Sequence, residues 1–448
     1  MAENVDKKNI KIMGYGMIIR LKSHSTKISK EKVWLTLYLF ILVFTPPVIP
    51  KIKIFHVLTF YSVFAIGIKY KMYVKEFLKQ VNVKVFIRGM GIYFLYVVIA
   101  EILSRTFEPV ENSAYLYVTY KFICTYIEIP ICCCYLYAYC RQRKIEFVEI
   151  VYALIHIGII QLVIGGIMML SPTIKQFLVS MMQANNNGSM DDISFWEYNR
   201  RYFAFSGCML DMFGWGFGII AGLPFYIKKV KLKYLIISPF LLVIGIMNST
   251  TTIIIYLVML AGGTTRMIID EHKIKKIYLL LIGIIPVVFG LGFQVMRLYA
   301  ADSFKWFLNE IMAMLGDSNK GSFTNIIDKR VWYLPESTIA RVFGTGHYVY
   351  AVKGFKHSDI GYINMIWIAG ILGTLILFVT LLSITRKCCE VNRTYSYLYV
   401  IVFILFWVFA IKGIGIGINP GMACTLIIYL LASVSKGNQN LYHERALF

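Results

Sequence analysis

Charged residues are scarce in this chain of 448 residues, where Asp, Glu, Lys and Arg together make up 16% of the sequence. A soluble globular domain carries about a quarter, and here 58% of the residues are hydrophobic. Apolar runs long enough to cross a bilayer recur throughout the chain. The composition therefore excludes an ordinary soluble protein and predicts an all-α fold, a polytopic transmembrane helical bundle.

The cysteines lack the spacing of a metal-binding or disulfide framework. Most of the nine fall into two groups, Cys132, Cys133, Cys134 and Cys140 in or near one apolar run and Cys388 and Cys389 beside another. Neither group contains a Cys-x-x-Cys pair with a matching second half. The sequence therefore predicts neither a zinc site nor disulfides.

A separate soluble domain and a cleavable secretory signal are also missing. Residues 1–32 are polar and basic, and we expect them to form a cytoplasmic segment before an apolar run that acts as an uncleaved anchor. The longest non-apolar stretch, 297–359, has about 60 residues, near the lower limit for independent folding. We therefore expect 1–448 to be one integral membrane domain with external loops at 171–204 and 297–359.

Twelve apolar runs between charged loops predict about twelve spans. The runs cover roughly 33–49, 54–70, 85–103, 114–139, 147–170, 205–227, one ending near 247, one ending near 260, 277–296, 360–384, 397–411 and 422–434. The net charge of +22 resides in short loops, and with an even count the lysine-rich loops and both termini face the cytoplasm. Residues 232–263 could form one long span instead of two, but an odd count would contradict the loop charges.

The segment 341–382 is the main pointer to function. It begins with a Gly-x-Gly turn at Gly344 and Gly346, and it carries no charge from Gly361 to Leu382. Between the two parts lie His347, Lys353, Lys356, His357, Ser358 and Asp359. Ionisable groups at the mouth of a span are costly unless they are hydrated, paired or used. The pattern therefore predicts a site at the membrane surface.

The large loop before this segment changes character along its length. Residues 302–320 are interpreted as a plain polar stretch, whereas aromatic side chains and cations mix from Arg330 onward. The aromatic members are Trp332, Tyr333, Phe343, Tyr348, Tyr350 and Phe355. Aromatic faces beside cations suit sugar rings and pyrophosphate, so this part is expected to pack against the bundle and to bind substrate.

Three motifs resemble those of the bacterial O-antigen and capsular repeat-unit polymerases (Wzy-type), which are related to the O-antigen ligases. The first is the Gly-x-Gly turn followed by Ser358-Asp359-Ile360-Gly361-Tyr362 and by Gly370-Ile371-Leu372-Gly373. The second is Arg200-Arg201-Tyr-Phe-Ala-Phe-Ser-Gly207 with Asp211 and Gly214, where the family's Pro-Asn pair is replaced by Asp211-Met212. The third, Asn248 to Thr252, lacks the arginine that relatives often carry, and its hydroxyls are expected to bond their own helix.

The resemblance implies glycosyl transfer in the bacterial cell membrane from one undecaprenyl-pyrophosphate carrier to a sugar hydroxyl on another. Arginines would stabilise the leaving pyrophosphate, and a histidine or aspartate would accept the proton of the acceptor. The expected catalytic residues are Arg201, Arg330, Arg341, His357 and Asp359. The expected substrate-binding residues are Arg200, His347, Tyr348, Tyr350, Lys353 and Lys356. No cofactor, metal or nucleic acid is expected. The expected partners are membrane lipid, a flippase and a chain-length regulator.

Two alternatives stay open at this point. An O-antigen ligase-type transferase belongs to the same superfamily, although the Ser358-Asp359 pair favours a polymerase over the His-Asn-like pair of ligases. A lipid-linked oligosaccharide flippase should carry polar groups along a path through the middle of its spans. Here such groups are few, and the exceptions include Glu128, His156 and Gln161.

Overall fold

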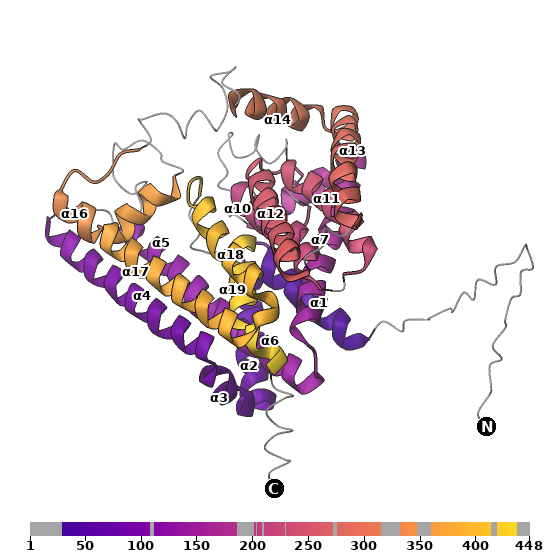
Figure 1. The fold of residues 1–448 in the computed structure, drawn as a ribbon. Coiled ribbons are helices and arrows are strands. Elements are labelled where there is room, and N and C mark those ends of the chain that lie inside the picture. The colour runs from indigo at the N-terminus through magenta and orange to yellow at the C-terminus, as the bar shows by residue number, and fades with distance from the viewer. Residues whose placement is uncertain are drawn as a thin grey trace, which may run out of the picture.

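The computed structural model describes residues 29–107, 112–185, 201–202, 204–207, 210–228, 230–271, 276–314, 332–346, 360–413 and 419–436. In these ranges the fold is all-α (Figure 1), as predicted. The helices are α1 (Lys30–Phe44), α2 (Ile54–Ala65), α3 (Lys71–Lys79), α4 (Val81–Phe107), α5 (Asn112–Ile123), α6 (Ile129–Arg143), α7 (Phe147–Leu170), α8 (Pro172–Asn185), α10 (Leu210–Gly222), α11 (Leu232–Ile246), α12 (Thr251–Glu271), α13 (Lys276–Tyr299), α14 (Ala301–Met314), α16 (Thr338–Phe343), α17 (Gly361–Val391), α18 (Ser396–Phe409) and α19 (Pro420–Leu430).

The number of candidate membrane spans differs from the expected twelve. Every predicted apolar run falls on a helix, but in the described residues only five helices are long and apolar enough to cross a membrane. They are Val81–Ser104, Val118–Arg143, Phe147–Leu170, Thr251–Ile269 and Gly361–Val391. By length and composition these helices suggest a multi-pass membrane protein.

Breaks inside the apolar runs account for the lower number. A span needs about 20 apolar residues, whereas α1 has 15 and stops where Thr45 adopts a left-handed conformation before Pro46 and Pro47. Helix α2 has 12 residues before a π-helical turn, and α19 has 11. In these three cases the apolar run is longer than its uninterrupted α-helix.

Two close packings organise the bundle. Helices α4 and α17 lie side by side along one flank (Figure 1), where Gly89 sits directly against Thr380. Helix α10 packs against α11, α12 and α19. Its buried Trp215 stacks on Phe409 with ring centroids 4.5 Å apart and lies against Gly421. The glycines permit these contacts because they leave no Cβ between the helices.

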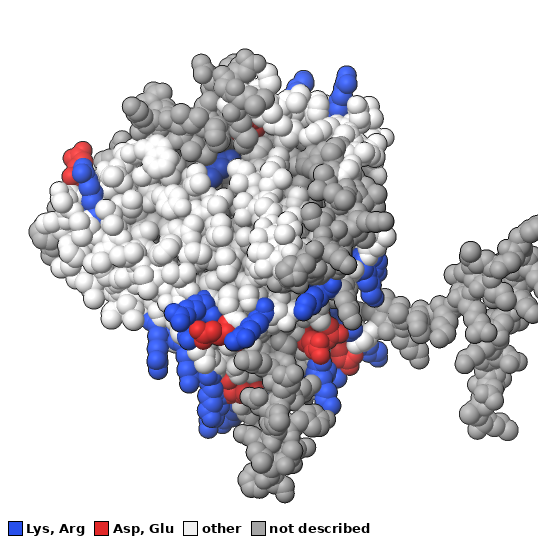
Figure 2. Space-filling view, in the orientation of Figure 1, with Lys and Arg blue, Asp and Glu red and all other residues white. Residues whose placement is uncertain are grey.

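The described lysines and arginines gather mainly along one rim of the bundle (Figure 2). We call this the cationic rim; it includes Lys71, Lys75, Lys79, Arg141, Arg143, Lys231, Lys233, Arg386 and Lys387. Ion pairs join several helix ends there: Lys32 to Glu149 at 2.7 Å, Arg143 to Glu31 at 3.1 Å and Arg141 to Glu76 at 2.8 Å.

Both ends of the described chain lie at this rim. Helix α1 begins beside Arg143 through the Glu31 pair. At the other end, Asn82 donates to the Tyr429 carbonyl at 2.7 Å, which places the end of α19 beside the start of α4. The described chain therefore starts and finishes on the same side of the bundle.

Candidate functional site

Arg201 lies beside the bend of the helical hairpin formed by α11 and α12, at the end of the hairpin that is away from the cationic rim. Helix α11 begins next to Lys231 at the rim, and α12 leads back from a bend at residues 247–250. The interval 232–263 is therefore two helices and not one, but of the two predicted spans only α12 is long enough to be a candidate span. Arg201 is 6% exposed, and its guanidinium donates to the carbonyl of Asn248 in the bend. A predicted catalytic residue is thus fixed on the third motif, although the two are far apart in sequence.

The segment around Arg201 is held by its own backbone. The Phe205 N–H donates to Gln161 Oε1 and the Phe205 carbonyl accepts from Gln161 Nε2, each at 2.9 Å. The side-chain amide of Asn248 donates to the Tyr202 carbonyl at 2.8 Å, and the Gly207 N–H donates to the Phe44 carbonyl at 2.8 Å. Backbone groups that leave water need such partners, and together these bonds fix the direction of Arg201.

Helix α14 supplies a wall beside this arginine. The Trp306 ring centroid lies 4.8 Å from Arg201 Cζ, a cation–π distance. The Tyr202 hydroxyl donates to the Tyr299 carbonyl at 3.3 Å, and the Lys175 ammonium lies 4.0 Å from the centre of the Tyr202 ring. We call Lys175, Arg201, Tyr202, Asn248 and Trp306 the Arg201 cluster.

Burial shifts the ionisation of this cluster. Desolvation lowers the pKa of Lys175 on α8 to about 8, although Asp302 at the start of α14 acts in the opposite direction. Burial also raises the pKa of the Tyr202 phenol, and Asp302 adds to that shift. The cluster therefore combines a permanently charged guanidinium with an ammonium that loses its proton around pH 8.

The hydroxyls of the third motif behave partly as expected. Ser249 Oγ accepts from the Thr251 N–H at 3.2 Å, which is a local bond at the start of α12. Asn248 donates both to the Ile244 carbonyl at 3.0 Å and to Tyr202. The motif therefore bonds its own helices and also positions the Arg201 segment.

The Gly-x-Gly turn docks on a break in α17. Gly370 has φ 62° and interrupts the helix, and the Thr345 and Gly346 N–H groups donate to the exposed carbonyls of Trp367 and Ile368 at 2.7 and 3.0 Å. Gly344 has φ 83°, and a Cβ there would lie 2.5 Å from the Gly370 nitrogen. Two glycine motifs of the resemblance thus fit together as a single structural joint.

Arg341 lies on a different part of the molecule from Arg201. It is exposed on α16, and its Nε donates to the Pro335 carbonyl at 2.6 Å. Figure 1 shows α16 on the flank formed by α4 and α17, whereas α14 lies beside α13, away from that flank. The structure does not bring the two arginines into contact.

The other predicted site residues lie outside the described residues. They are Arg330, His357 and Asp359 among the expected catalytic residues, and Arg200, His347, Tyr348, Tyr350, Lys353 and Lys356 among the expected substrate-binding residues.

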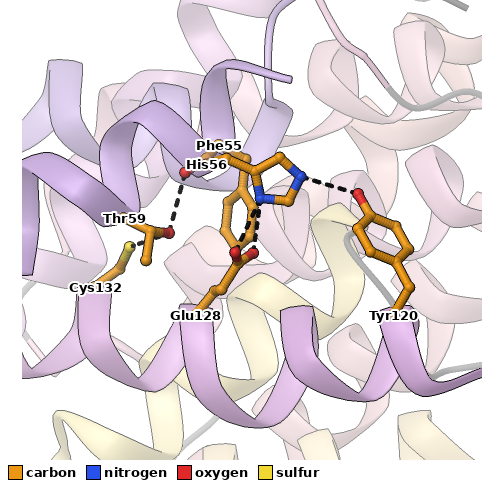
Figure 3. Close-up of polar contacts among 6 residues, drawn as sticks. All are labelled: Phe55, His56, Thr59, Tyr120, Glu128 and Cys132. Carbon is orange, nitrogen blue, oxygen red and sulfur yellow. Dashed lines mark hydrogen bonds and ion pairs between the residues drawn. The ribbon is translucent and has the colours of Figure 1, made fainter. Parts of the chain in front are cut away.

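The three polar exceptions in the spans each have a defined partner. Gln161 holds the Arg201 segment, and His156 Nε2 lies 2.7 Å from the Tyr234 hydroxyl. Glu128 pairs with His56 of α2 (Figure 3), with 2.9 Å from His56 Nδ1 to the nearer carboxylate oxygen. Sequence reasoning did not single out His56, and an isolated glutamate in an apolar run was its only signal.

The side chains of the Arg201 cluster are of the kinds that suit an anion with attached rings. Arginine binds phosphate oxygens through paired donors and stays charged at all relevant pH values, and Lys175, which lies against Tyr202, carries a second positive charge. Comparison with known proteins adds no name: no family model, curated protein or solved structure matches the chain.

Proposed function

We propose that this chain polymerises oligosaccharide repeat units carried on undecaprenyl pyrophosphate into a surface polysaccharide. The acceptor sugar hydroxyl attacks the anomeric carbon of the donor, and the lipid pyrophosphate leaves with the bonding electrons. The observation that carries the proposal is the Arg201 cluster, a buried cation with a second cation and an aromatic wall at the end of the bundle away from the cationic rim. The motif resemblance supplies the reaction.

The uneven distribution of charge over the bundle supports a particular orientation in the membrane. Cationic loops are retained in the cytoplasm, so we place the cationic rim and both termini on that side of a bacterial cell membrane. The Arg201 cluster then faces the outer surface, where a flippase would deliver lipid-linked repeat units. A chain-length regulator fits the same surface.

Arg201 has the central role in this mechanism. Negative charge builds on the bridging oxygen as the pyrophosphate departs, and a fixed guanidinium stabilises it without reorganisation. Lys175 adds a second positive charge to the departing group. His357 and Asp359 orient and deprotonate the acceptor hydroxyl. Arg330 and Arg341 were expected to stabilise the pyrophosphate with Arg201, but Arg341 lies apart from Arg201 on α16, so the proposal for the leaving group rests on Arg201. Arginine and lysine meet the electrostatic need here, so the transfer itself is proposed to need no metal.

The placement of buried charge argues against a flippase. Among the described side chains the buried charged ones are Arg201, Arg266 and Glu310. Arg201 meets the bend at the start of α12, whereas Arg266 lies near its end and donates to the Phe225 carbonyl at 3.2 Å. Fifteen residues of helix, about 22 Å, separate the two ends. A conduit would place such groups along the path between them.

The test replaces Arg201 with Lys and with Ala in cells whose own copy of the gene is deleted. Loss of the guanidinium is expected to slow polymerisation on the order of 10²–10³-fold for Arg201→Ala, so the surface glycan should collapse to single repeat units. Arg201→Lys keeps the charge but not the paired donors and should give short chains. Glycan length is read on a gel, with protein level checked by an epitope tag.

Arg266→Lys is the control, because Arg266 near the end of α12 is, with Arg201, one of the two buried arginines among the described residues. It should leave chain length unchanged. Normal ladders from Arg201→Ala at normal protein level would refute the role of Arg201. Loss of even single-repeat surface material would indicate a flippase, and accumulation of full-length polymer on the lipid carrier would indicate a ligase.

A further inference from the structure

A second polar cluster connects α2 to the junction of α5 and α6. His56 Nδ1 lies 2.9 and 3.0 Å from the two carboxylate oxygens of Glu128, and His56 Nε2 lies 3.0 Å from the Tyr120 hydroxyl (Figure 3). The potential ligand atoms of His56, Cys124 and Glu128 all lie within 4.8 Å of one another. An imidazole, a thiol and a carboxylate thus converge on one point.

The local backbone brings Cys124 and Glu128 together. Residues Cys124–Glu128 form a π-helical turn between α5 and α6. Such turns are rare inside helices and occur frequently at functional sites. The turn lies within the candidate span Val118–Arg143, where an acidic residue is costly unless it has a specific partner.

We propose that this cluster is a binding site for a zinc-type divalent metal ion. Its ligands are His56 Nδ1, a Glu128 carboxylate oxygen and Cys124 Sγ. Nitrogen, oxygen and sulfur together suit Zn²⁺ and its neighbours, whereas Mg²⁺ and Ca²⁺ prefer oxygen alone. Three protein ligands leave a fourth tetrahedral position for water or another donor.

Hydrogen bonding around His56 is compatible with this role. Metal binding requires Nδ1 without a proton, so the neutral ring carries its proton on Nε2 and donates it to the Tyr120 hydroxyl. The Cys124 thiol loses its proton to solvent on binding. Without the ion, the other tautomer fits the same contacts, with Nδ1–H donating to Glu128 and the Tyr120 hydroxyl donating to Nε2. The same four side chains therefore satisfy both states.

Two of the three ligands lie partly at the surface of the bundle. The side chains of His56 and Glu128 are 29% and 18% exposed, whereas Cys124 is fully buried. Binding would tie α2 to the α5–α6 helix, since His56 comes from the first and the other two ligands from the second. The site shares no residue with the Arg201 cluster, so the inference stands whether or not the proposed polymerase activity is correct.

The test uses the full-length protein in detergent, stripped of metal by a chelator and titrated with Co²⁺ as a spectroscopic probe for Zn²⁺. One equivalent should bind and give a thiolate-to-cobalt charge-transfer band together with tetrahedral ligand-field bands in the visible. Addition of Zn²⁺ should remove these bands by displacement. Zn²⁺ should also raise the thermal unfolding temperature, because an ion that binds the folded state stabilises it.

Variants separate this site from the other thiols. Cys124→Ser should abolish the charge-transfer band, and Glu128→Gln, which keeps the size and a hydrogen bond to His56, should weaken Co²⁺ binding at least 10-fold. Cys134→Ser on α6 is the matched control, since Cys134 is a buried free cysteine outside the cluster, and it should bind like the wild type.

Two results would overturn the site. One is a wild-type protein that shows no cobalt bands and no Zn²⁺-dependent stabilisation, which would leave His56 and Glu128 as a polar contact between helices. The other is a charge-transfer band that survives in Cys124→Ser. Glu128→Gln, which is expected to fold, keeps the test decisive if Cys124→Ser proves unstable.

Discussion

Arg201 illustrates how a cation can be kept inside a helical bundle. Removing a guanidinium from water costs several kcal/mol unless its donors find partners. The Asn248 carbonyl lies just beyond the C-terminal end of α11, where the helix dipole places partial negative charge. The Trp306 ring covers one face of the guanidinium. These contacts make a fixed arginine feasible at this position.

Lys175 gives the Arg201 cluster a pH dependence. Burial lowers its pKa to about 8 from the ordinary 10.5, so the ammonium is present below pH 8 and is lost as the pH rises through that value. Binding of inorganic pyrophosphate to the purified protein should therefore weaken above pH 8. Because a charge-assisted hydrogen bond contributes about 1.5–3 kcal/mol, Lys175→Met should weaken binding at pH 7 by about 10-fold or more.

The same shift affects stability in the opposite sense. The folded state disfavours the charged form of Lys175, so its destabilising contribution is present below pH 8 and is relieved between about 8 and 10.5. An arginine at this position stays charged, so Lys175→Arg should remove the pH dependence of pyrophosphate binding and the pH dependence of stability between about pH 8 and 10.5. Pyrophosphate affinity that is unchanged from pH 7 to 9 in the wild type would contradict the assignment.

At the scale of helices, the main device is the interrupted helix. Helix α17 breaks at Gly370, and the freed carbonyls of Trp367 and Ile368 accept hydrogen bonds from the turn that follows α16. Ser104 and Tyr96 of α4 donate to the carbonyls of Thr345 and Phe343 at 2.6 and 3.1 Å. The described end of the large loop is therefore attached to two long helices at the mouth of a span.

Gly344 is the most sensitive position of this joint. Gly344→Ala places a side chain at φ 83°, which costs about 1–2 kcal/mol, and forces it against the Gly370 backbone, which costs about 1–3 kcal/mol more. The turn should detach from α17, and limited proteolysis should cut the loop faster. Gly91→Ala on α4 is the control, because its Cβ would meet nothing within 4 Å. Equal proteolysis rates in the two variants would show that the joint does not hold the loop.

Sequence patterns predict helices better than their interruptions. The expected run 147–170 coincides with α7, bounded by a capping box at Glu146 and Glu149. The π turn at Cys124, by contrast, lies within a continuous apolar sequence and depends on tertiary packing. Sequence therefore gives the class and most helix positions, but not the number of helices that reach span length.

The sequence predicts the candidate site only in part, because the contacts of the site also depend on tertiary packing. Arg201 and Asn248 were both noted as motif residues, but their contact depends on the bend between α11 and α12. Trp306 was missed because 302–320 was interpreted as a plain polar stretch, whereas α14 buries Phe307 and Glu310. The signal was an amphipathic period, with apolar residues at Phe304 and Phe307, that would have predicted a packed helix.

At the scale of the whole molecule, charge separates the two ends of the bundle. The cationic rim collects the ends of α3, α6 and α17 and the start of α11. Helix α14 and the Arg201 cluster occupy the other end (Figure 1). In the proposed orientation, cations are retained in the cytoplasm, so the rim lies inside and the Arg201 cluster faces outward.

This orientation predicts the accessibility of single cysteines. Asn309→Cys on α14 should react with a membrane-impermeant maleimide in intact cells, whereas Arg386→Cys at the rim should react only after permeabilisation. Both positions are exposed in the structure. Of the eight described cysteines, seven are buried and Cys389 is only partly accessible; Cys208 lies outside the described residues, so labelling is compared with the protein that lacks the new cysteine. Labelling of both positions from the same side would contradict the topology and would place the Arg201 cluster where no exported glycan could reach it.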